Sequence, residues 1–488
     1  MIFLAAVDTA VNESPKETDM KLSGEYETDR DALKDACGFG KCFDLKERTL
    51  TLGQRRATLL YPASMTSSES LERMLAAYLG CAVKEDDTAE TYTARCLVVG
   101  NLTLTDDLAS AASEVRAGSS VLLVEGFARL MVTDTKAIPS RGITEPQHDQ
   151  VLRGAREGFT EHLLENTAIL RRRLPTPDLH LELVRVGDGT PTNLILCFVE
   201  GRAEERYVTA IRDKLKAIRV DALSLGQESL AECLIRRKWY NPFPKFRYTE
   251  RPDAAAAMLL EGSVLIMCDA SPQLMVLPVG IFDFVQETDD FYFPPLLGTY
   301  LRLLRGVIFL LSLLLTPLWY LLIRNPGWIP GWLDFIKLSE PPTFPVLLQL
   351  LLVEFTIDGL KLASLNTPNM LGNSLSVVAG LILGDFAIQV GWLDPEVILY
   401  MSFVSMANFA QPSFELGYAF KFMRILLLIA TALFNAWGFG IGLAAIVLLI
   451  GLNKTVDGSR SYLYPVIPFN KDAFLRQFFR TKLSSKTK

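Results

Sequence analysis

Four ionisable residues stand inside long apolar stretches in the C-terminal part of this chain. Glu354, Asp358 and Lys361 share one such stretch, and Asp385 stands alone in the next. The i, i+4, i+7 spacing of the first three residues puts them on one face of a helix. Because exposing a charge to lipid costs several kcal/mol, each of these side chains is expected to face a helix-bundle interior or water.

Two interpretations of these residues are open from the sequence. In the first, Glu354, Asp358, Lys361 and Asp385 belong to an ion pathway or to its gate, because such a path needs ionisable groups at depth. In the second, Asp358 and Lys361 neutralise each other, and the pair holds helices together or lies at the membrane interface. The spacing alone does not decide between them.

The overall composition hides two different parts. The chain has 488 residues, of which 50% are hydrophobic and 21% charged, and its formal net charge is −6. This balance excludes a disordered chain and argues against a nucleic-acid-binding protein. Residues 1–295 carry 34 basic and 45 acidic side chains (net −11), whereas residues 296–488 carry 15 and 10 (net +5). Only 13 of the 147 positions from 306 to 452 are charged, which predicts a membrane-embedded segment.

The fold class predicted from these features is an α/β N-terminal cytosolic domain with two similar subdomains, followed by an α-helical polytopic membrane domain. The similarity of the subdomains rests on an internal echo, since residues 118–132 and 262–276 both read as strand, acidic turn and strand. The expected segments are a disordered lead (1–36), a first α/β subdomain (37–150), a connecting helix (151–178), a second α/β subdomain (179–295), a membrane domain with about four to six helical segments (296–452) and a basic cytosolic tail (453–488).

Local patterns predict several elements of the first part. A hairpin over Thr49–Tyr61 is expected to turn at Gly53, because glycine supplies the backbone angles of a tight turn. Apolar periodicity predicts helices over Glu69–Leu79 and Phe159–Leu174, the second with Thr160 as a candidate cap. Further predicted elements are strands at 96–99, 121–124 and 193–199, a helix at 204–218, and a hairpin of 264–267 with 274–279.

The sequence contains no motif for catalysis or for cofactor binding. GxxxxGK[ST], GxGxxG after a strand, HExxH and GxSxG are all absent, so no enzyme, cofactor or catalytic residue is predicted. The three histidines lack ligand spacing, and metal binding is not expected. The seven cysteines form no CxxC pair; we expect buried free thiols rather than a disulfide or zinc set.

The positive-inside rule orients the predicted membrane segments. Arg302 and Arg305 lie at the start of the first segment, before its uncharged stretch, and place the large domain on the cytosolic side. Lys421 and Arg424 are expected to lie in a later cytosolic loop. The predicted spans are 296–323, 371–393, 397–414 and 425–452, with 346–362 as an ambiguous fifth.

The C-terminal tail complicates this topology. It carries 8 basic and 2 acidic residues after Leu452, which conflicts with a single crossing by 425–452. Either Asn435–Gly440 breaks that run into a re-entrant pair, or another segment does not cross, and we favour the broken run. The residues expected to pack or break membrane helices are Pro368, Gly380, Gly384, Gly438 and Gly440.

Several blocks of sequence carry a family resemblance. Arg153-Gly-Ala-Arg-Glu-Gly-Phe-Thr-Glu161 and Thr249-Glu-Arg-Pro-Asp253 are the most specific, and Gly380-Leu-Ile-Leu-Gly384 adds to them. These blocks resemble the A-subunit family of bacterial spore germinant receptors over residues 37–475. The chain departs from the family pattern at Ala155, where members usually read Pro, and at Asn366, where receptor subunits usually carry Arg before the membrane proline.

This resemblance implies a multi-pass protein of the spore inner membrane, with its large domain on the cytosolic (core) side. It implies a homo-oligomeric ion channel component that releases, or amplifies the release of, cations on germination. A small membrane partner, or receptor B and C subunits, would assemble with it. The charge of the basic tail itself, apart from the resemblance, predicts either contact with anionic lipid at the cytosolic surface or ordinary anchoring of the topology. The alternatives are an A subunit of a nutrient germinant receptor and a non-conducting relay or scaffold subunit. The residues expected to couple the domains are Arg156, Glu157, Glu161, Glu250, Arg251 and Asp253.

Overall fold

The computed structural model describes residues 21–96, 101–137, 155–235, 240–287, 289–366, 386–453, 455–456 and 462–479. The chain divides into two compact units, which are described separately below. Unit 1 comprises residues 1–236 and 246–279, and unit 2 comprises residues 237–245 and 280–488.

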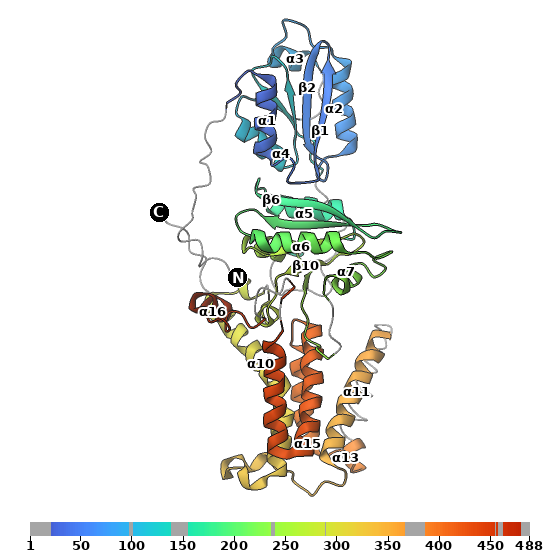
Figure 1. Cartoon of the computed structure of the whole chain (residues 1–488), viewed down its shortest axis with the longest axis vertical. Coiled ribbons are helices and arrows are strands. Elements are labelled where there is room, and N and C mark those ends of the chain that lie inside the picture. Colours follow the sequence, from blue (N-terminus) through green and yellow to red (C-terminus); the bar gives the residue numbers. More distant parts are fainter. Residues whose placement is uncertain are drawn as a thin grey trace. The chain divides into compact units, whose positions relative to one another are not determined.

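The first half of unit 1 is a five-stranded antiparallel sheet covered by helices. The strands follow the order β1-β2-β4-β5-β3, and every neighbouring pair is antiparallel. Figure 1 shows α1 and α4 together on one side of this sheet and α2 on the other. The elements are α1 (Tyr26–Cys37), β1 (Leu45–Leu52), β2 (Arg55–Pro62), α2 (Ser68–Gly80), α3 (Ala89–Arg95), β3 (Leu102–Thr105), α4 (Leu108–Arg116), β4 (Ser120–Val124) and β5 (Leu130–Thr133).

The second half of unit 1 repeats this arrangement. After the connecting helix α5 (Leu163–Arg173), a second antiparallel sheet follows the order β6-β7-β9-β10-β8. Strand for strand, this is the order of the first sheet, with helices at the same places in the chain, which confirms the two similar subdomains. The elements are β6 (Leu179–Val186), β7 (Thr192–Val199), α6 (Glu205–Ala217), α7 (Gln227–Leu234), β8 (Arg247–Thr249), α8 (Pro252–Leu260), β9 (Val264–Cys268) and β10 (Leu274–Leu277).

Local sequence signals decide several of these elements. Gly53 has a φ of +69°, and an added Cβ would lie 2.6 Å from the Val83 carbonyl oxygen, so the β1–β2 turn requires glycine. The predicted hairpin and the helix α2 are confirmed. The connecting helix starts at Leu163 rather than at the expected Phe159, because the Asn166 side chain accepts from the Thr160 backbone N–H at 2.7 Å and holds the preceding turn open.

Helix α1 occupies part of the segment that was expected to be disordered. Tyr26, Leu33 and Cys37 recur on one face and are buried against the first sheet and α4. The buried Asp29 carboxylate accepts hydrogen bonds from the Ser23 backbone N–H at 2.7 Å and the Gly24 backbone N–H at 3.0 Å, which fixes the helix start. Three apolar residues at helical spacing in an otherwise polar stretch were too weak a signal to predict this helix from the sequence.

Unit 2 is helical in its described residues. Helices α10 and α15 are long and apolar enough to cross a membrane. The buried core of this unit contains Trp319, Leu350, Val397 and Leu428, one from each of α10, α11, α14 and α15. Its elements are η1 (Ile281–Phe284), α9 (Asp289–Tyr292), α10 (Pro295–Arg324), η2 (Pro326–Trp328), η3 (Gly331–Ile336), α11 (Val346–Asn366), α13 (Ala387–Gln389), α14 (Pro395–Phe409), α15 (Phe414–Gly451) and α16 (Lys471–Phe478).

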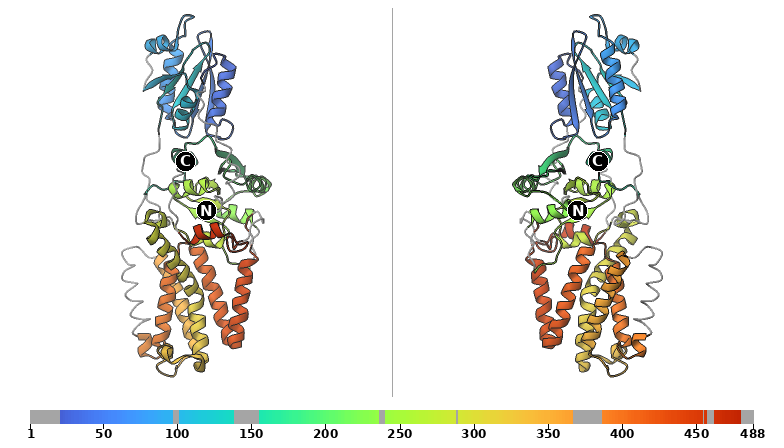
Figure 2. Two further views of the ribbon diagram at one scale, coloured as in Figure 1. Left: turned by 90° about the vertical axis from the view of Figure 1, so that its left-hand side faces the viewer. Right: turned by 90° about the vertical axis from the view of Figure 1, so that its right-hand side faces the viewer.

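Helix α15 is two helices joined at Asn435. This residue has φ 54° and ψ −132°, outside the helical region. A Cβ on Gly438 would lie 1.9 Å from the Ala430 carbonyl oxygen, and one on Gly442 would lie 2.7 Å from Leu427 Cδ1. The chain therefore turns back on itself after Asn435, and Figure 2 shows the two halves side by side. This turn is the break predicted from the sequence.

The predicted helix-packing glycines divide into two groups. Gly438 lies at the closest approach of the two halves of α15, as just described. Gly440 belongs to the run that breaks at Asn435; a Cβ on it would meet no atom within 4 Å in the described part of the chain, so a packing role for it stays a prediction. Pro368, Gly380 and Gly384 lie outside the described residues.

The segments that flank the helices of unit 2 are hydrogen-bonded to each other. The backbone N–H of Ile281 donates to the Tyr462 carbonyl oxygen at 3.0 Å, and the Tyr462 hydroxyl donates to the Pro244 carbonyl oxygen at 2.6 Å. Arg302 at the start of α10 donates to the Gln477 carbonyl oxygen in α16 at 3.3 Å. The chain therefore enters and leaves the helical region at the same end.

Candidate functional site

The candidate site of unit 2 is a cluster of buried charges between α11 and α15. Glu354 and Asp358 lie one helical turn apart on α11, which is why they share a face. Lys421 Nζ lies 2.9 Å from Glu354 Oε1 and also pairs with Asp358. Arg424 Nη2 donates to both carboxylate oxygens of Glu354 at 2.8 Å each. Glu354 and Arg424 retain 5% and 0% exposure, so this is an interior ion-pair network.

Further hydrogen bonds tie this network to α10. The Arg424 guanidinium donates through Nη1 to the Ser312 carbonyl oxygen. The Ser312 hydroxyl in turn accepts from Gln411 Nε2 at 3.0 Å. One arginine thus contacts α10, α11 and its own helix. Because a buried charge is costly unless it is paired and hydrogen-bonded, these contacts fix the relative positions of three helices.

The charges of the network balance without Lys361. Glu354 and Asp358 carry two negative charges, and Lys421 and Arg424 carry two positive ones. The predicted mutual pair of Asp358 and Lys361 is wrong, because Asp358 binds Lys421 of α15 instead. Among the described residues no carboxylate forms an ion pair with Lys361.

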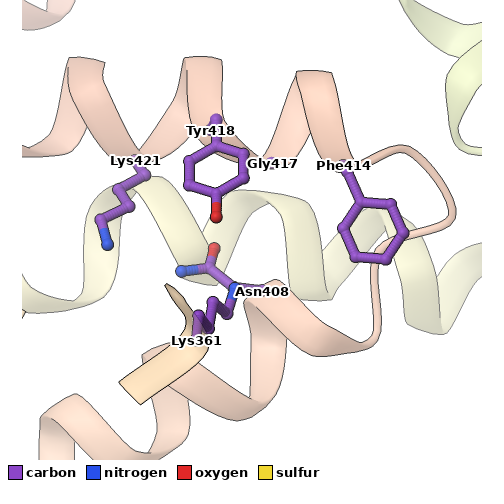
Figure 3. A pocket seen from close by; sticks show the side chains of 6 residues that line it. All are labelled: Lys361, Asn408, Phe414, Gly417, Tyr418 and Lys421. Atoms are coloured by element: carbon purple, nitrogen blue, oxygen red, sulfur yellow. The ribbon is translucent and has the colours of Figure 1, made fainter. Parts of the chain in front are cut away.

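Lys361 contacts aromatic rings in place of a carboxylate. Its ammonium group lies 4.4 Å from the centroid of the Phe409 ring and 5.5 Å from that of Tyr418. A small pocket beside it is lined by Lys361, Asn408, Phe414, Gly417, Tyr418 and Lys421. Figure 3 shows Lys361 next to the Asn408 amide, with the Tyr418 hydroxyl directed toward that amide. The fourth predicted member of the site, Asp385, lies outside the described residues.

The basic residues that were used to orient the membrane segments are buried in ion pairs. Lys421 and Arg424 lie within helix α15, so their assignment to a cytosolic loop is wrong. Arg302 Nε lies 3.2 Å from Asp290 Oδ2, and Arg305 pairs with the same carboxylate at 2.7 Å. Counting charges along a sequence does not reveal which of them a tertiary partner will neutralise.

The predicted coupling residues of unit 1 lie in the two sequence blocks that carry the family resemblance, the block that ends at Glu161 and the block Thr249–Asp253. The structure brings these two blocks together. Glu157 binds both Arg172 and Arg173 of α5, the latter at 2.6 Å. The backbone N–H of Phe159 donates to the Glu250 carbonyl oxygen at 2.8 Å.

The remaining coupling residues support the same junction. The buried Arg251 side chain pairs with Asp253 at 2.6 Å on the first turn of α8. The Glu161 carbonyl oxygen accepts from the backbone N–H of Ala270, between β9 and β10, at 3.1 Å. Arg156, the last predicted member, precedes Glu157 in the same described segment. These contacts hold the entry to α5 on the second subdomain.

Sequence reasoning missed one buried pair at the same junction. Arg171 donates to Asp44 through Nε at 3.0 Å and through Nη2 at 2.5 Å. The Ser64 hydroxyl donates to the Asp44 carboxylate at 2.6 Å. Asp44 belongs to the first subdomain and Arg171 to the connecting helix. An Arg171-Arg172-Arg173 run resembles a solvated basic face, and nothing local marks its first member as buried.

The cysteines differ from the expectation at one pair. Cys81 follows α2, Cys96 follows α3, and the two form a disulfide with a Cα–Cα distance of 5.9 Å. The expected free thiols are therefore wrong for this pair, because the fold brings the C-terminal ends of α2 and α3 together although the two residues have no CxxC spacing. The other five cysteines are free, and four of them are buried. No group of three or more metal-ligating side chains occurs among the residues that the structure describes.

A two-sheet α/β unit followed by helices, two of them long and apolar enough to cross a membrane, fits a protein with a membrane region. The sequence model of the Bacillus/Clostridium GerA spore germination protein family matches residues 32–488, and the chain belongs to this family. The resemblance to germinant-receptor A subunits is thereby confirmed.

The chain is also similar to individual proteins. Stage V sporulation protein AF of Bacillus subtilis (strain 168) is 31% identical over 468 residues, covering 96% of this chain and 94% of the relative. Spore germination protein KA of the same organism is 28% identical over 372 residues, covering 75% and 68%. The crystal structure of the N-terminal domain of the A subunit of the Bacillus megaterium spore germinant receptor GerK3 is 26% identical, with a TM-score of 0.41, covering 53% of this chain and 97% of that chain.

Proposed function

We propose that this GerA-family chain is a multi-pass membrane subunit of the spore germination machinery. In this proposal it is a homo-oligomeric ion channel component that releases cations, or amplifies their release, when germination is triggered. The buried network of Glu354, Lys421 and Arg424 is the latch that keeps the pathway closed. The observation that carries the proposal is the complete pairing of Glu354 by two basic residues of α15.

A latch fits the energetics better than an open pathway. A carboxylate that lines a cation path must be free to contact the ion, whereas both acids of α11 are already neutralised. Removing one partner of a buried pair costs about 3–5 kcal/mol, because the other charge is left uncompensated. A signal that separates α11 from α15 would therefore free two acids together, and a closed state resting on this network would change cooperatively.

The hydrogen bonds at the ends of unit 2 support a location on one side of the membrane for both flanking segments. Ile281 and Tyr462 pair directly, so the tail returns to the side from which α10 starts. The excess of basic residues in that tail favours the cytosolic side, which is the core side in a spore. The large unit 1 is then cytosolic, the membrane is the spore inner membrane, and the basic tail contacts anionic lipid.

Two alternatives remain, and they differ in what α11 does. As an A subunit of a nutrient germinant receptor, the chain would assemble with B and C subunits. As a non-conducting relay or scaffold, it would use the same network only to hold helices together. In the proposal itself the partners are further copies of the chain and a small membrane subunit.

Ion flux after neutralising Glu354 tests the latch. In spores that carry Glu354→Gln, or in vesicles that contain the purified variant, we expect cation release without the trigger, because Arg424 and Lys421 lose their shared carboxylate. The double variant Glu354→Arg with Arg424→Glu should restore a closed state, since it rebuilds the pair in reverse. Glu340→Gln, on the exposed loop between α10 and α11, is the matched control. Unchanged flux at normal protein level in Glu354→Gln would favour the scaffold.

A further inference from the structure

The segment between α10 and α11 is apolar on its exposed side as well as on its buried side. Ile329 and Ile336 are buried in the core of unit 2. The exposed side consists of three aromatic side chains with exposed fractions of 57%, 76% and 76%, namely Trp328, Trp332 and Phe335. A group of large exposed apolar side chains marks a surface that contacts a membrane or another protein.

The charges of this segment cancel. Between Asn325 and Leu338 the charged residues are Asp334 and Lys337, and their side chains pair with each other. The segment therefore offers no net charge to an acidic or a basic partner. What remains for a contact is its aromatic surface.

One hydrogen bond fixes the level of the segment along α10. The indole N–H of Trp319 donates to the Ile336 carbonyl oxygen at 2.9 Å. Trp319 lies four residues, or about 6 Å, before the end of the charge-free stretch 306–323. η3 therefore folds back beside the last turns of α10, a helix long and apolar enough to cross a membrane. Phe335, the neighbour of Ile336, is thereby held close to the end of the apolar stretch.

The segment is also fixed to α14. The Trp319 ring is 3% exposed and stacks on Tyr400, with the ring centroids 4.5 Å apart. Just after the segment, the backbone N–H of Ser339 donates to the Glu396 carboxylate at 3.1 Å. Because α10 and α14 both hold it, the segment presents its aromatic side chains at one level.

We propose that residues 326–336 lie in the lipid–water interface, with their three exposed aromatic side chains among the headgroups and the upper acyl chains. Figure 1 shows this segment at the end of α10 opposite to α16. Tryptophan gathers at this depth in membrane proteins, because its ring is apolar and its N–H is polar. The proposal rests on the proposed membrane location and adds the surface that sets the height of α10. Since the Ser312 carbonyl oxygen of α10 accepts from Arg424, that height also sets the position of the buried network in the bilayer.

Depth-dependent fluorescence quenching tests this placement in the full-length protein. Gly331→Cys in a Cys233→Ser background provides an exposed thiol for a nitrobenzoxadiazole label, since the other free cysteines are buried. An added Cβ at Gly331 would meet no atom within 4 Å in the described part of the chain, so the aromatic side chains stay in place. In phosphatidylglycerol vesicles we expect strong quenching by phosphatidylcholine with a nitroxide near its glycerol backbone. A nitroxide near the end of the acyl chain should quench less, and iodide on both sides of the membrane should quench little.

A label within α10 is the matched control. Leu310→Cys places it at a 61% exposed position near the middle of the charge-free stretch. That label should respond most to the deep nitroxide. If neither nitroxide quenched it, the proposed membrane location would be wrong, and this proposal with it.

Removing the aromatic side chains tests whether they hold the segment in the interface. Trp332→Ser with Phe335→Ser should abolish most of the lipid quenching at position 331 and allow quenching by iodide, whereas Trp332→Phe should keep the original pattern. With the control at position 310 quenched by lipid, two results would overturn the interface proposal alone. Strong iodide quenching at position 331 with the aromatic residues present would place the segment in water. Protection from iodide and from both nitroxides would show that a protein surface covers it.

Discussion

Asp44 and Arg171, separated by 127 positions in the chain, form a buried two-point ion pair in unit 1. The pair connects the first subdomain to the helix that leads into the second. Backbone hydrogen bonds extend the contact, because the Phe43 N–H donates to the Leu181 carbonyl oxygen at 3.0 Å and the Leu181 N–H donates to that of Lys41 at 3.1 Å. The two similar subdomains are therefore joined through β6 and α5.

Neutralising one member of this pair should loosen the junction strongly. Asp44→Asn leaves the Arg171 charge buried without a counter-ion, and we expect a loss of about 3–5 kcal/mol. Hydrogen–deuterium exchange of the full-length protein should show faster exchange in α5. Arg73→Gln breaks an exposed pair on α2 and is the control, with an expected effect below about 1 kcal/mol. The double variant Asp44→Asn with Arg171→Met should recover part of the loss; if it does not, the pair itself is not the cause.

The turn at Asn435 should depend on both its backbone and its side chain. Asn435 and Asn325 exchange amide hydrogen bonds at 2.7 and 3.0 Å, which pins the turn to the end of α10. Asn435→Ala retains the unfavourable positive φ and removes both bonds, so we expect about 2–3 kcal/mol of destabilisation.

Asn435→Gly distinguishes the two contributions. It relieves the backbone and loses only the hydrogen bonds, so its thermal unfolding should fall between those of the wild type and Asn435→Ala. The side of the membrane on which a C-terminal tag is accessible to protease checks the turn directly. A tag that moves to the opposite side in Asn435→Ala would show that a straight helix had replaced the turn; equal stability of all three proteins would contradict its role.

The number of free thiols tests the disulfide between Cys81 and Cys96. Protein that is purified without reductant and then denatured should expose five free thiols of its seven cysteines, and all seven after reduction. Cys81→Ser should raise the count without reductant from five to six, because Cys96 is released and all six remaining cysteines are then free. It should also cost about 3 kcal/mol, as expected for a closed loop of about 15 residues. Cys233→Ser, at a half-exposed free thiol, is the control; seven thiols without reductant would disprove the pair.

Unit 1 should lose stability at alkaline pH. Burial raises the pKa of the Cys37 thiol to about 12 and that of Cys268 to about 11. Above the pKa of an unfolded cysteine, near 8.5, the unfolded chain releases protons that the folded chain retains, so stability falls as pH rises. At pH 10 each buried thiol should account for a loss of about 2 kcal/mol.

Thermal unfolding between pH 7 and pH 10.5 measures this dependence. Cys37→Ser removes one titrating group and should flatten the pH profile, whatever its effect at neutral pH. Burial raises the pKa of Tyr78 to about 12 as well. Because an unfolded tyrosine titrates only near 10, its contribution to the loss of stability begins at a higher pH than that of the thiols. An unchanged slope in Cys37→Ser would mean that other groups dominate.

The sequence predicted those features that local chemistry determines. The Gly53 turn, helix α2 and the internal echo follow from glycine geometry and from apolar periodicity. The break at Asn435 followed from the conflict between a single crossing by residues 425–452 and the basic tail that comes after them. Each of these signals lies within a few dozen consecutive residues.

The charge pairs could not be predicted in this way. Glu354 and Asp358 were recognised as buried acids, but their partners are supplied by α15, about 70 residues later. Nothing in the local pattern distinguishes Lys421 in a helix from a lysine in a loop. The same holds for Arg171, whose buried position depends on a carboxylate in another subdomain.

The hydrogen bonds that join the two ends of unit 2 make its helices a mechanically closed chain. Because Ile281 before α10 is bonded to Tyr462 after α15, displacement of either segment acts on both. A pull on the start of α10 therefore reaches Arg424 by two routes, through Ser312 along α10 and through Tyr462 back along α15. Forces that arrive from both sides would load the ion pairs of Glu354 together rather than one after another. The network would therefore stay intact under small displacements of the helices and break over a narrow range of larger ones.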